Sequence, residues 1–228
     1  MCNRGGGCTD QAFAVRQVCE KYFANGKDVF YGFMDLEKAY DTIDRHGMWQ
    51  MLRVYGVGRK LLKAVQSFYV DSRACVRVGN DVSEFFPVNV GLRHGCVVSP
   101  WLFNVYMNGV VREVNVTVLG KGLELLSANG GRFEIKQLLF ADADDTTLVA
   151  DSEEKLGRLV SEFVRVCERK KLRVNVAKNK VMRCARYDKG NRMHVILNGK
   201  PLEEVDYFFT WGRTWQPMED VKGMWYTE

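Results

Sequence analysis

The chain has 228 residues, of which 46% are hydrophobic and 12% aromatic, and its formal net charge is +5. This length can bury the core of one domain with an appendage, and the composition excludes a fibrous or disordered protein. No apolar run approaches the roughly 20 residues that a membrane helix needs, and the N-terminal segment lacks the apolar stretch of a secretory signal. Seven scattered cysteines without a C-x-x-C pair indicate neither a disulfide framework nor a zinc site. We therefore expect an intracellular protein.

The first half of the chain alternates helix and strand signals. In chain order these are a helix from Thr9 or Asp10 to near Gly26, a strand over 28–35, helices at about 45–55 and 58–69, a hairpin over 73–90 turning at Gly79-Asn80-Asp81, and a helix from Ser99-Pro100. The strand DVFYGFMD is apolar on both faces, which is typical of a strand covered on both sides, and it delivers Asp35 at its carboxyl end.

The second half predicts hairpins around one long helix. The signals are a turn at Asn129-Gly130-Gly131, a strand over 133–140, a hairpin with its tip at 141–145 and its return strand at 147–150, an amphipathic helix opened by Asp151 with Glu154, strands near 172–176 and 180–184, and a turn at Asn198-Gly199. From about residue 210 there is no clear period, which predicts a poorly specified tail.

Basic residues gather between 165 and 200, where twelve Lys and Arg face two acidic residues, a local net charge of +10. Such a stretch would attract phosphate groups. The alternative is an ordinary solvated face, since basic runs are common.

Two acidic positions stand at strand ends. Asp35 ends the first long strand, and Asp144-Asp145 lies at the tip of the later hairpin. If these strands lie side by side, their carboxylates would converge and repel one another unless a cation such as Mg²⁺ neutralises them. Two such ions about 4 Å apart can activate a hydroxyl and stabilise a leaving phosphate. The alternative is turn chemistry, because Asp is favoured in hairpin loops.

Four blocks of the sequence resemble the motifs of reverse transcriptases, in the family's order and rough spacing. They are FMDLEKAYD (33–41) for motif A, GLRHGCVVSPWLFNVYMN (91–108) for motif B, LLFADADDTTLVA (138–150) for motif C and KKLRVNVAKNKVM (170–182) for motif D. GCTDQAF and LEEVDYFFTWG extend the resemblance over most of residues 8–209. The motif sequences resemble most closely those of the non-LTR, LINE-like branch of retrotransposon enzymes.

The resemblance implies an α+β fold, the palm of a right-hand polymerase. We expect an antiparallel sheet of about four strands with helices packed on one face, plus small hairpins. The implied divisions are a residual fingers or entry helix (1–27), the palm (28–209) and a divergent tail without a thumb (210–228). The implied function is RNA-directed DNA polymerase, working in the nucleus on an RNA template, a DNA primer and deoxynucleoside triphosphates with two Mg²⁺ or Mn²⁺ ions.

The resemblance also implies roles for single residues. Asp35 would bind both metal ions together with Asp144 and Asp145, and the peptide groups of Leu36 and Glu37 would face the incoming triphosphate.

Three further residues take roles by the same resemblance. Tyr40 would be the steric gate that excludes a ribose 2′-hydroxyl, unless it is a core aromatic, and Gly95 would support the nascent base pair. Lys178 would protonate the leaving pyrophosphate or act as a plain phosphate contact.

The chain departs from the family pattern at motif C and at motif B. Motif C reads Phe-Ala-Asp-Ala-Asp-Asp, as though Ala-Asp were duplicated, so either Asp144 and Asp145 or Asp142 could be the metal ligand. Motif B carries His94 in place of the usual glutamine, which alters the reach of a nucleotide contact.

Fingers and thumb sequences are not recognised at the two ends, and an endonuclease domain is not recognised either. A truncated genomic copy is therefore expected, and the alternative function is an inactive remnant that only holds nucleic acid. A nucleotide cyclase on a palm-like fold is disfavoured, because a cyclase has no template for motif B to hold.

Overall fold

The computed structural model describes residues 8–118, 123–126, 132–135, 139–142, 145–185, 192–206, 208–210 and 213–215, with side chains over 13–117, 146–185 and 192–206.

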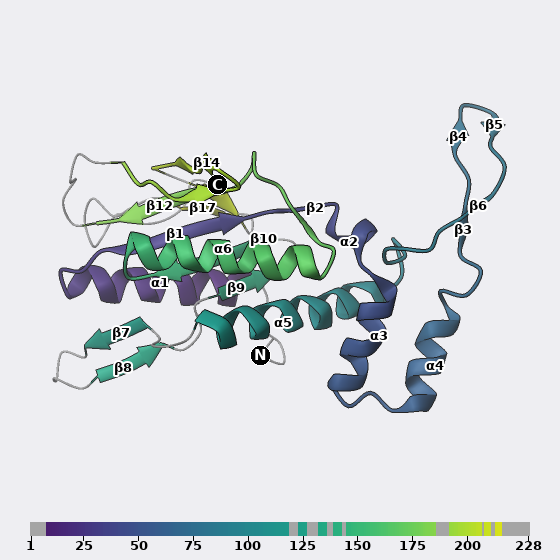
Figure 1. Ribbon diagram of the computed structural model, residues 1–228, viewed down its shortest axis with the longest axis horizontal. Coiled ribbons are helices and arrows are strands. Elements are labelled where there is room, and N and C mark those ends of the chain that lie inside the picture. The colour runs from purple at the N-terminus through teal and green to yellow at the C-terminus, as the bar shows by residue number, and fades with distance from the viewer. Residues whose placement is uncertain are drawn as a thin grey trace.

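A five-stranded sheet forms the centre of the molecule (Figure 1). Its order is β15 (Glu203–Glu204), β12 (Lys180–Cys184), β1 (Val29–Met34), β10 (Asp145–Ala150) and β9 (Leu139–Asp142). All neighbours are antiparallel except β12 and β15. The six residues of β1 are all buried, as its unbroken apolar sequence predicts for a strand at the middle of a covered sheet.

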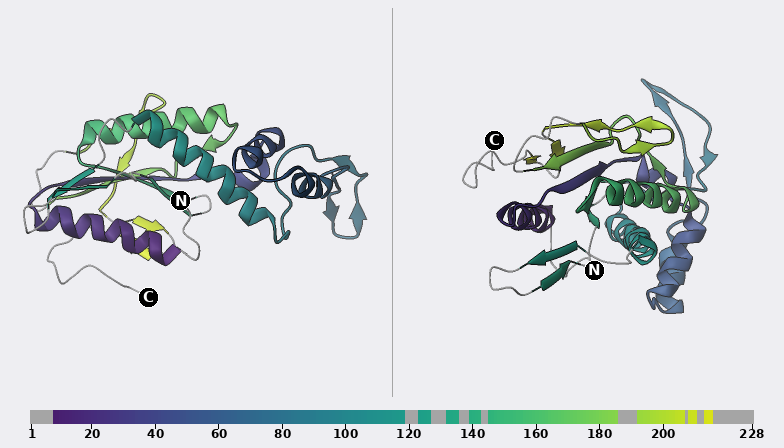
Figure 2. Two further views of the ribbon diagram at one scale, coloured as in Figure 1. Left: turned by 90° about the horizontal axis from the view of Figure 1, so that it is seen from below. Right: turned by 60° about the vertical axis from the view of Figure 1, so that its left-hand side comes forward.

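Helices cover both faces of this sheet (Figure 2). On one face lie α5 (Ser99–Val118) and α6 (Glu153–Arg169), and a Cβ built on Gly32 of β1 would stand 3.3 Å from Leu156 of α6. On the other face lies α1 (Cys8–Ala24), where the Tyr31 hydroxyl donates a hydrogen bond to the Val15 carbonyl at 3.2 Å. The α+β palm architecture is confirmed, but the prediction of helices on one face only was wrong, because β1 is apolar on both faces and needs cover on both.

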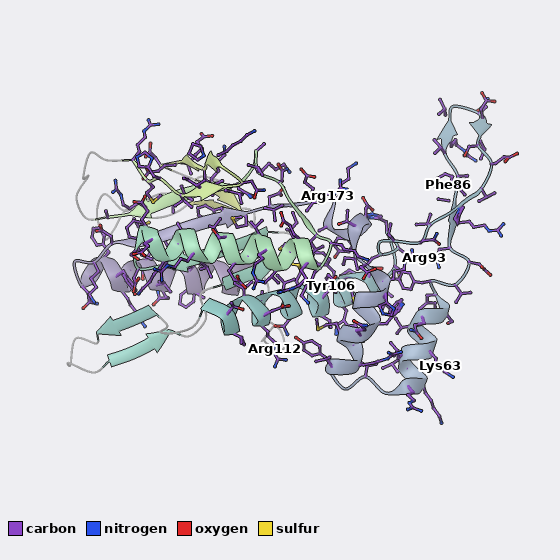
Figure 3. All side chains as sticks on the ribbon, in the orientation of Figure 1. Lys63, Phe86, Arg93, Tyr106, Arg112 and Arg173 are labelled. Carbon is purple, nitrogen blue, oxygen red and sulfur yellow. The ribbon has the colours of Figure 1, made fainter. Side chains whose placement is uncertain are left out.

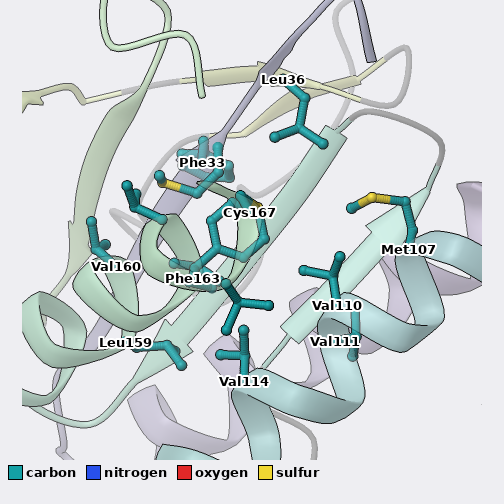
Figure 4. Packing of buried hydrophobic residues seen from close by; sticks show 14 of the residues in the cluster. Phe33, Leu36, Met107, Val110, Val111, Val114, Leu159, Val160, Phe163 and Cys167 are labelled. Atoms are coloured by element: carbon teal, nitrogen blue, oxygen red, sulfur yellow. The ribbon is translucent and has the colours of Figure 1, made fainter. Parts of the chain in front are cut away.

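The core between α5 and α6 is apolar throughout (Figure 4). Phe163 of α6 is fully buried, with Val110 and Val114 of α5 in the same cluster. The N-cap of α6 is Ser152, one residue after the predicted cap Asp151, and its hydroxyl accepts a hydrogen bond from the Lys155 amide at 3.3 Å. Such caps stabilise a helix by about 1 kcal/mol.

A second group of elements leaves the sheet after β2 (Leu36–Glu37) (Figure 1). It comprises α2 (Ala39–Thr42), α3 (Arg45–Val54), α4 (Arg59–Ser67) and a projecting hairpin built from β3 (Arg73–Ala74), β4 (Arg77–Val78), β5 (Asp81–Val82) and β6 (Phe86–Pro87). The two helices and the hairpin lie where the sequence predicts them.

Short two-stranded pairs complete the described parts. They are β2 with β11 (Arg173–Val174), β7 (Leu123–Leu126) with β8 (Arg132–Ile135), β13 (Ile196–Leu197) with β14 (Lys200–Pro201), and β16 (Phe208–Thr210) with β17 (Arg213–Trp215). The last pair includes residues 213–215, which lie in the stretch predicted to be a divergent tail, and that division of the chain stays a prediction. The predicted strand over 133–140 falls partly on 136–138, outside the described residues. None of the described helices is long and apolar enough to cross a membrane.

Candidate functional site

Asp35 stands at the first residue after β1, and the loop before β12 holds its backbone. Its amide donates a hydrogen bond to Oδ1 of Asn179 at 2.8 Å, and its carbonyl accepts one from the Asn175 amide at 2.9 Å. The Lys178 Nζ lies 3.5 Å from Oδ2 of Asp35. The pairing of β1 with β12 puts Phe33 opposite Lys180, so the loop that precedes Lys180 necessarily meets the residues that follow Phe33.

The motif C strand runs beside the same end of β1. Met34 pairs with Thr146, and β10 begins at Asp145, so the backbone of Asp145 lies next to that of Asp35. The expectation that these two strands lie side by side is confirmed. Asp145 in turn pairs with Asp142 on β9. Asp144 and the side chains of Asp142 and Asp145 lie outside the described residues.

A surface pocket of 360 Å³ opens beside Asp35. Its lining residues are Asp35, Leu36, Glu37, Lys38, Thr42, Arg173, Asn175 and Lys178. The β2–β11 pair forms one wall, with Glu37 opposite Arg173. The pocket thus brings together four of the residues assigned by resemblance, namely Asp35, Leu36, Glu37 and Lys178, while their roles stay predictions.

A second cluster joins motif A to motif B. The Tyr40 ring stacks on Phe103 with ring centroids 4.5 Å apart, and it lies 6.0 Å from the ring of His94. The His94 Nε2 is 2.6 Å from Oδ1 of Asp41, and both side chains are more than half exposed. Tyr40 therefore packs partly against the core and partly beside an exposed imidazole, an arrangement compatible with either of its two predicted roles. Gly95 follows with a φ of +74° and open space around its Cβ position.

Arg45 fixes the loop that carries motif B, and sequence reasoning missed it. Its guanidinium donates hydrogen bonds to three carbonyls, those of Val88 at 2.7 Å, Gly91 at 2.8 Å and Val90 at 3.2 Å. It also lies over the Tyr69 ring, 4.9 Å from the centroid. Burial lowers the pKa of Arg45 from its usual value. No motif signals these contacts, because they join residues more than 40 positions apart.

Gly91 allows this loop to approach motif A closely. Its φ is +78°, and a Cβ at this position would lie 2.6 Å from the backbone carbonyl oxygen of Asp41. Its amide donates to the Ile43 carbonyl at 2.9 Å. Only glycine fits both conditions without a shift of the backbone.

Tyr106 of α5 holds the end of α6, from which motif D continues. Its hydroxyl donates a hydrogen bond to the Lys170 carbonyl at 2.8 Å. Burial, and to a lesser degree the charge of Asp44, raise the pKa of Tyr106 to about 12. The side chain is 2% exposed.

The basic stretch over 165–200 is largely neutralised by acids from elsewhere in the chain. The pairs are Arg165 with Glu162, Arg169 and Lys170 with Glu113, Lys171 with Asp44, Lys178 with Asp35, Lys180 with Glu203, and Arg183 with Glu204. Seven of the ten cations that the structure describes in this stretch therefore have a carboxylate within 4.0 Å, so the local net charge counted along the sequence overstates what this surface offers to phosphate.

The fold is similar to part of solved telomerase structures. The chain superimposes on telomerase from Candida albicans, solved with the TWJ fragment of telomeric RNA, with a TM-score of 0.65 at 11% identity, covering 92% of this chain and 32% of that one. Apo telomerase from Candida tropicalis, truncated from the C-terminal domain, gives a TM-score of 0.61 at 11% identity, covering 90% and 38%. At such identities the likeness establishes the fold alone.

The family model for reverse transcriptase (RNA-dependent DNA polymerase) matches residues 5–208, and the chain belongs to this family. Among curated proteins it is similar to the Pol polyprotein of the type-2 retrotransposable element R2DM of Drosophila melanogaster, with 26% identity over 136 residues, which is 60% of this chain and 13% of the relative. The R2 polyprotein of Popillia japonica is 24% identical over 36% of this chain and 14% of its own length. The chain thus spans about an eighth of these relatives, and the resemblance to a LINE-like, non-LTR reverse transcriptase domain is confirmed.

Proposed function

We propose that this chain catalyses RNA-templated DNA synthesis, in which a primer 3′-hydroxyl attacks the α-phosphate of a deoxynucleoside triphosphate. A new P–O bond forms, the bond to the β-phosphate breaks, and pyrophosphate leaves. The observation that supports this most directly is the position of Asp35, at the end of β1 beside the first residue of β10, in a pocket that also contains Lys178. By analogy with the family, we also propose that the chain acts in the nucleus.

The surroundings of Asp35 fit a pair of divalent ions, Mg²⁺ or Mn²⁺, held by Asp35, Asp144 and Asp145. Oxygen ligands are those that Mg²⁺ prefers. Asn179 accepts the Asp35 amide hydrogen bond at its Oδ1, and its buried Nδ2 has no hydrogen-bond partner within the described parts of the chain. Such an atom can bond the water that Mg²⁺ usually retains. The ions would lower the pKa of the primer hydroxyl and stabilise the charge on the leaving phosphate.

The strand order favours Asp145 over Asp142 as a ligand shared with Asp35. Asp145 lies on β10, the direct neighbour of β1, whereas Asp142 lies on β9, one strand further out. Neighbouring strands are about 4.8 Å apart, so the backbone of Asp142 is about 10 Å from that of β1. The reading of motif C in which Asp144 and Asp145 are the catalytic pair is therefore the one we propose.

The chain's own groups would position the nucleotide. The peptide groups of Leu36 and Glu37 would face the triphosphate, and Lys178 would give a proton to the leaving pyrophosphate. Tyr40 and His94, in the adjoining cluster, would meet the sugar, and Gly95 would lie under the new base pair. Positioning and charge neutralisation supply most of the catalysis in phosphoryl transfer.

Primer extension tests the proposal. The wild-type chain, an Asp35→Asn variant and a chain lacking Ala141 and Asp142 are compared on an RNA template with Mg²⁺. We expect extension by the wild type and none above background by Asp35→Asn, because the amide keeps the size but loses the charge that binds metal. Asp35→Asn should still bind the primer–template. Equal extension by wild type and Asp35→Asn would rule out this site.

The second candidate function is nucleic-acid binding without synthesis, favoured by the extra Ala-Asp in motif C. A metal site tolerates shifts well below 1 Å, and two added residues near a hairpin tip can exceed that. Salt-dependent binding without extension by the wild type would support this second function. Extension gained by deleting Ala141 and Asp142 would identify the insertion as the lesion.

A further inference from the structure

One short stretch of the chain contains several basic residues and no acidic ones. Residues 45–70, which comprise α3, α4 and their flanks, contain Arg45, Arg53, Arg59, Lys60 and Lys63 and no acidic residue. The other 28 Lys and Arg residues are matched by the 28 Asp and Glu residues, so this stretch carries the equivalent of the whole formal net charge of +5.

Four of these cations form what we name the basic corner, Arg53, Arg59, Lys60 and Lys63. All four are exposed, at the end of α3 and the beginning of α4, around the turn at 55–58. Within the described residues none of them makes an ion pair, in contrast to seven of the basic residues between 165 and 200. Arg112 of α5 lies next to the corner, with its guanidinium 5.7 Å from the centre of the Tyr55 ring (Figure 3).

The placement of these charges is unfavourable for the isolated helix. Arg59 and Lys60 occupy the first turn of α4, which has no acidic residue and no side-chain cap. The N-terminal end of a helix carries partial positive charge, so cations there repel it, and natural helices usually place acids in this turn. Two large apolar side chains, Val54 and Leu61, are also exposed here, at 76% and 59%.

We propose that the basic corner binds the phosphate backbone of a nucleic acid strand outside the nucleotide pocket. An extended polyanion would neutralise the repelling cations and the uncapped end of α4 together, and it would leave Val54 and Leu61 free to contact sugars. α3 begins three residues after α2, which contributes Thr42 to the pocket, and its ten residues span about 15 Å. At 3.4 Å per nucleotide this length corresponds to about four nucleotides, so the corner would meet the strand at about that distance from the reacting end.

The test measures binding alone, without metal or nucleotide, so its result is independent of whether the chain polymerises. The triple variant Arg59→Gln, Lys60→Gln and Lys63→Gln is compared with a control of equal charge change on α6, Lys155→Gln, Arg158→Gln and Arg165→Gln. Each of these three cations already pairs with an acid. Arg158 and Arg165 pair with acids of α6, and Lys155 pairs with Asp151, just before the helix. Thermal unfolding of both variants verifies that they are folded.

Affinity for a fluorescent single-stranded RNA and for an RNA–DNA duplex is measured over a series of salt concentrations. For the corner variant we expect the slope of log affinity against log salt to fall by about 2 to 3 units, since each lost phosphate contact removes about 0.7 to 0.9. The α6 control should keep a slope of log affinity against log salt that is at least two thirds of the wild-type slope. The substrate that shows the larger change identifies which strand the corner holds.

An unchanged slope in the corner variant, on both substrates, would overturn the proposal. An equal loss in the α6 control would do so too, because the effect would then be one of net charge. Loss of primer extension with an unchanged slope would concern the catalytic proposal and not this one.

Discussion

Lys178 and Asp35 form the closest charged contact in the pocket, with Nζ and Oδ2 3.5 Å apart. The lysine side chain is 68% exposed, so the pair is solvent-screened and can open when other ligands enter. Two roles for this lysine, proton donor and plain phosphate contact, both agree with its place in the pocket. They differ in whether an arginine can replace it.

Lys178→Met and Lys178→Arg separate these roles. If Lys178 protonates pyrophosphate, both substitutions lower kcat by about 100-fold or more, because arginine keeps the charge but does not release a proton. Only Lys178→Met should also lower the Mg²⁺ concentration needed, since it removes a cation beside a metal ligand. Primer-extension rates against Mg²⁺ concentration measure both effects. A normal rate for Lys178→Arg would leave phosphate contact as the role.

Tyr106 provides a pH-dependent contribution to stability. Its pKa is raised from the ordinary tyrosine value of about 10 to about 12, so between these values the folded state keeps a proton that the unfolded state loses. The contribution is complete below pH 10 and is lost as pH rises toward 12, at about 1.4 kcal/mol per unit. Tyr106→Phe should be less stable at neutral pH by about 1 kcal/mol and should lose less stability between pH 10 and 12. Urea unfolding at several pH values tests this, and parallel pH curves for both proteins would contradict it.

At the scale of elements, motifs A, B and D are held to one another by backbone contacts. Motif D supplies both hydrogen bonds to the backbone of Asp35, and the motif B loop bonds to Tyr40 and Ile43 through the amides of Leu92 and Gly91. Arg45 adds three bonds from α3 to the same loop. The loops around Asp35 and Tyr40 are thus fixed by elements outside the sheet as well as by β1 and β10.

Gly91→Ala and Gly95→Ala form a matched pair that tests the tightest of these contacts. Both glycines have a positive φ, but only Gly91 would bring its Cβ to 2.6 Å from a backbone oxygen. Gly95→Ala should cost about 1 kcal/mol from backbone strain alone. Gly91→Ala should cost more and should lower extension, because the motif B loop must move off Asp41. Thermal unfolding and primer extension measure the two effects, and equal stabilities would show that the contact is not tight.

Across the whole molecule, short-range signals predicted the elements well. Ser99-Pro100, the unbroken apolar strand at 28–35 and the hairpin at 73–90 each depend on residues next to one another, and each lies where the sequence indicates. The palm fold and the family followed from the spacing of four motifs. The register of β1 and β10 places Asp35 beside the first residue of β10, as predicted from the positions of the acidic residues at the two strand ends.

Contacts between distant residues could not be predicted in this way. Asn179 meets the Asp35 amide across 144 positions, and Glu113 neutralises Arg169 across 56. A count of charges along 165–200 leaves out the paired acids, because these lie outside that range in the sequence. The same count over 45–70 would have been the better guide, since no acid lies in that stretch and none of the described acids pairs with its exposed cations.

The four cations of the basic corner, which make no ion pair within the described residues, give the turn between α3 and α4 a positive local potential. A positive potential attracts a polyanion before contact, so the polyanion would preferentially approach the turn between α3 and α4. Capture would then be fast at low ionic strength and would slow as salt shortens the range of the field to about 10 Å at 0.1 M. The acids that pair with seven basic residues after 165 leave those residues less able to compete with the basic corner for a polyanion.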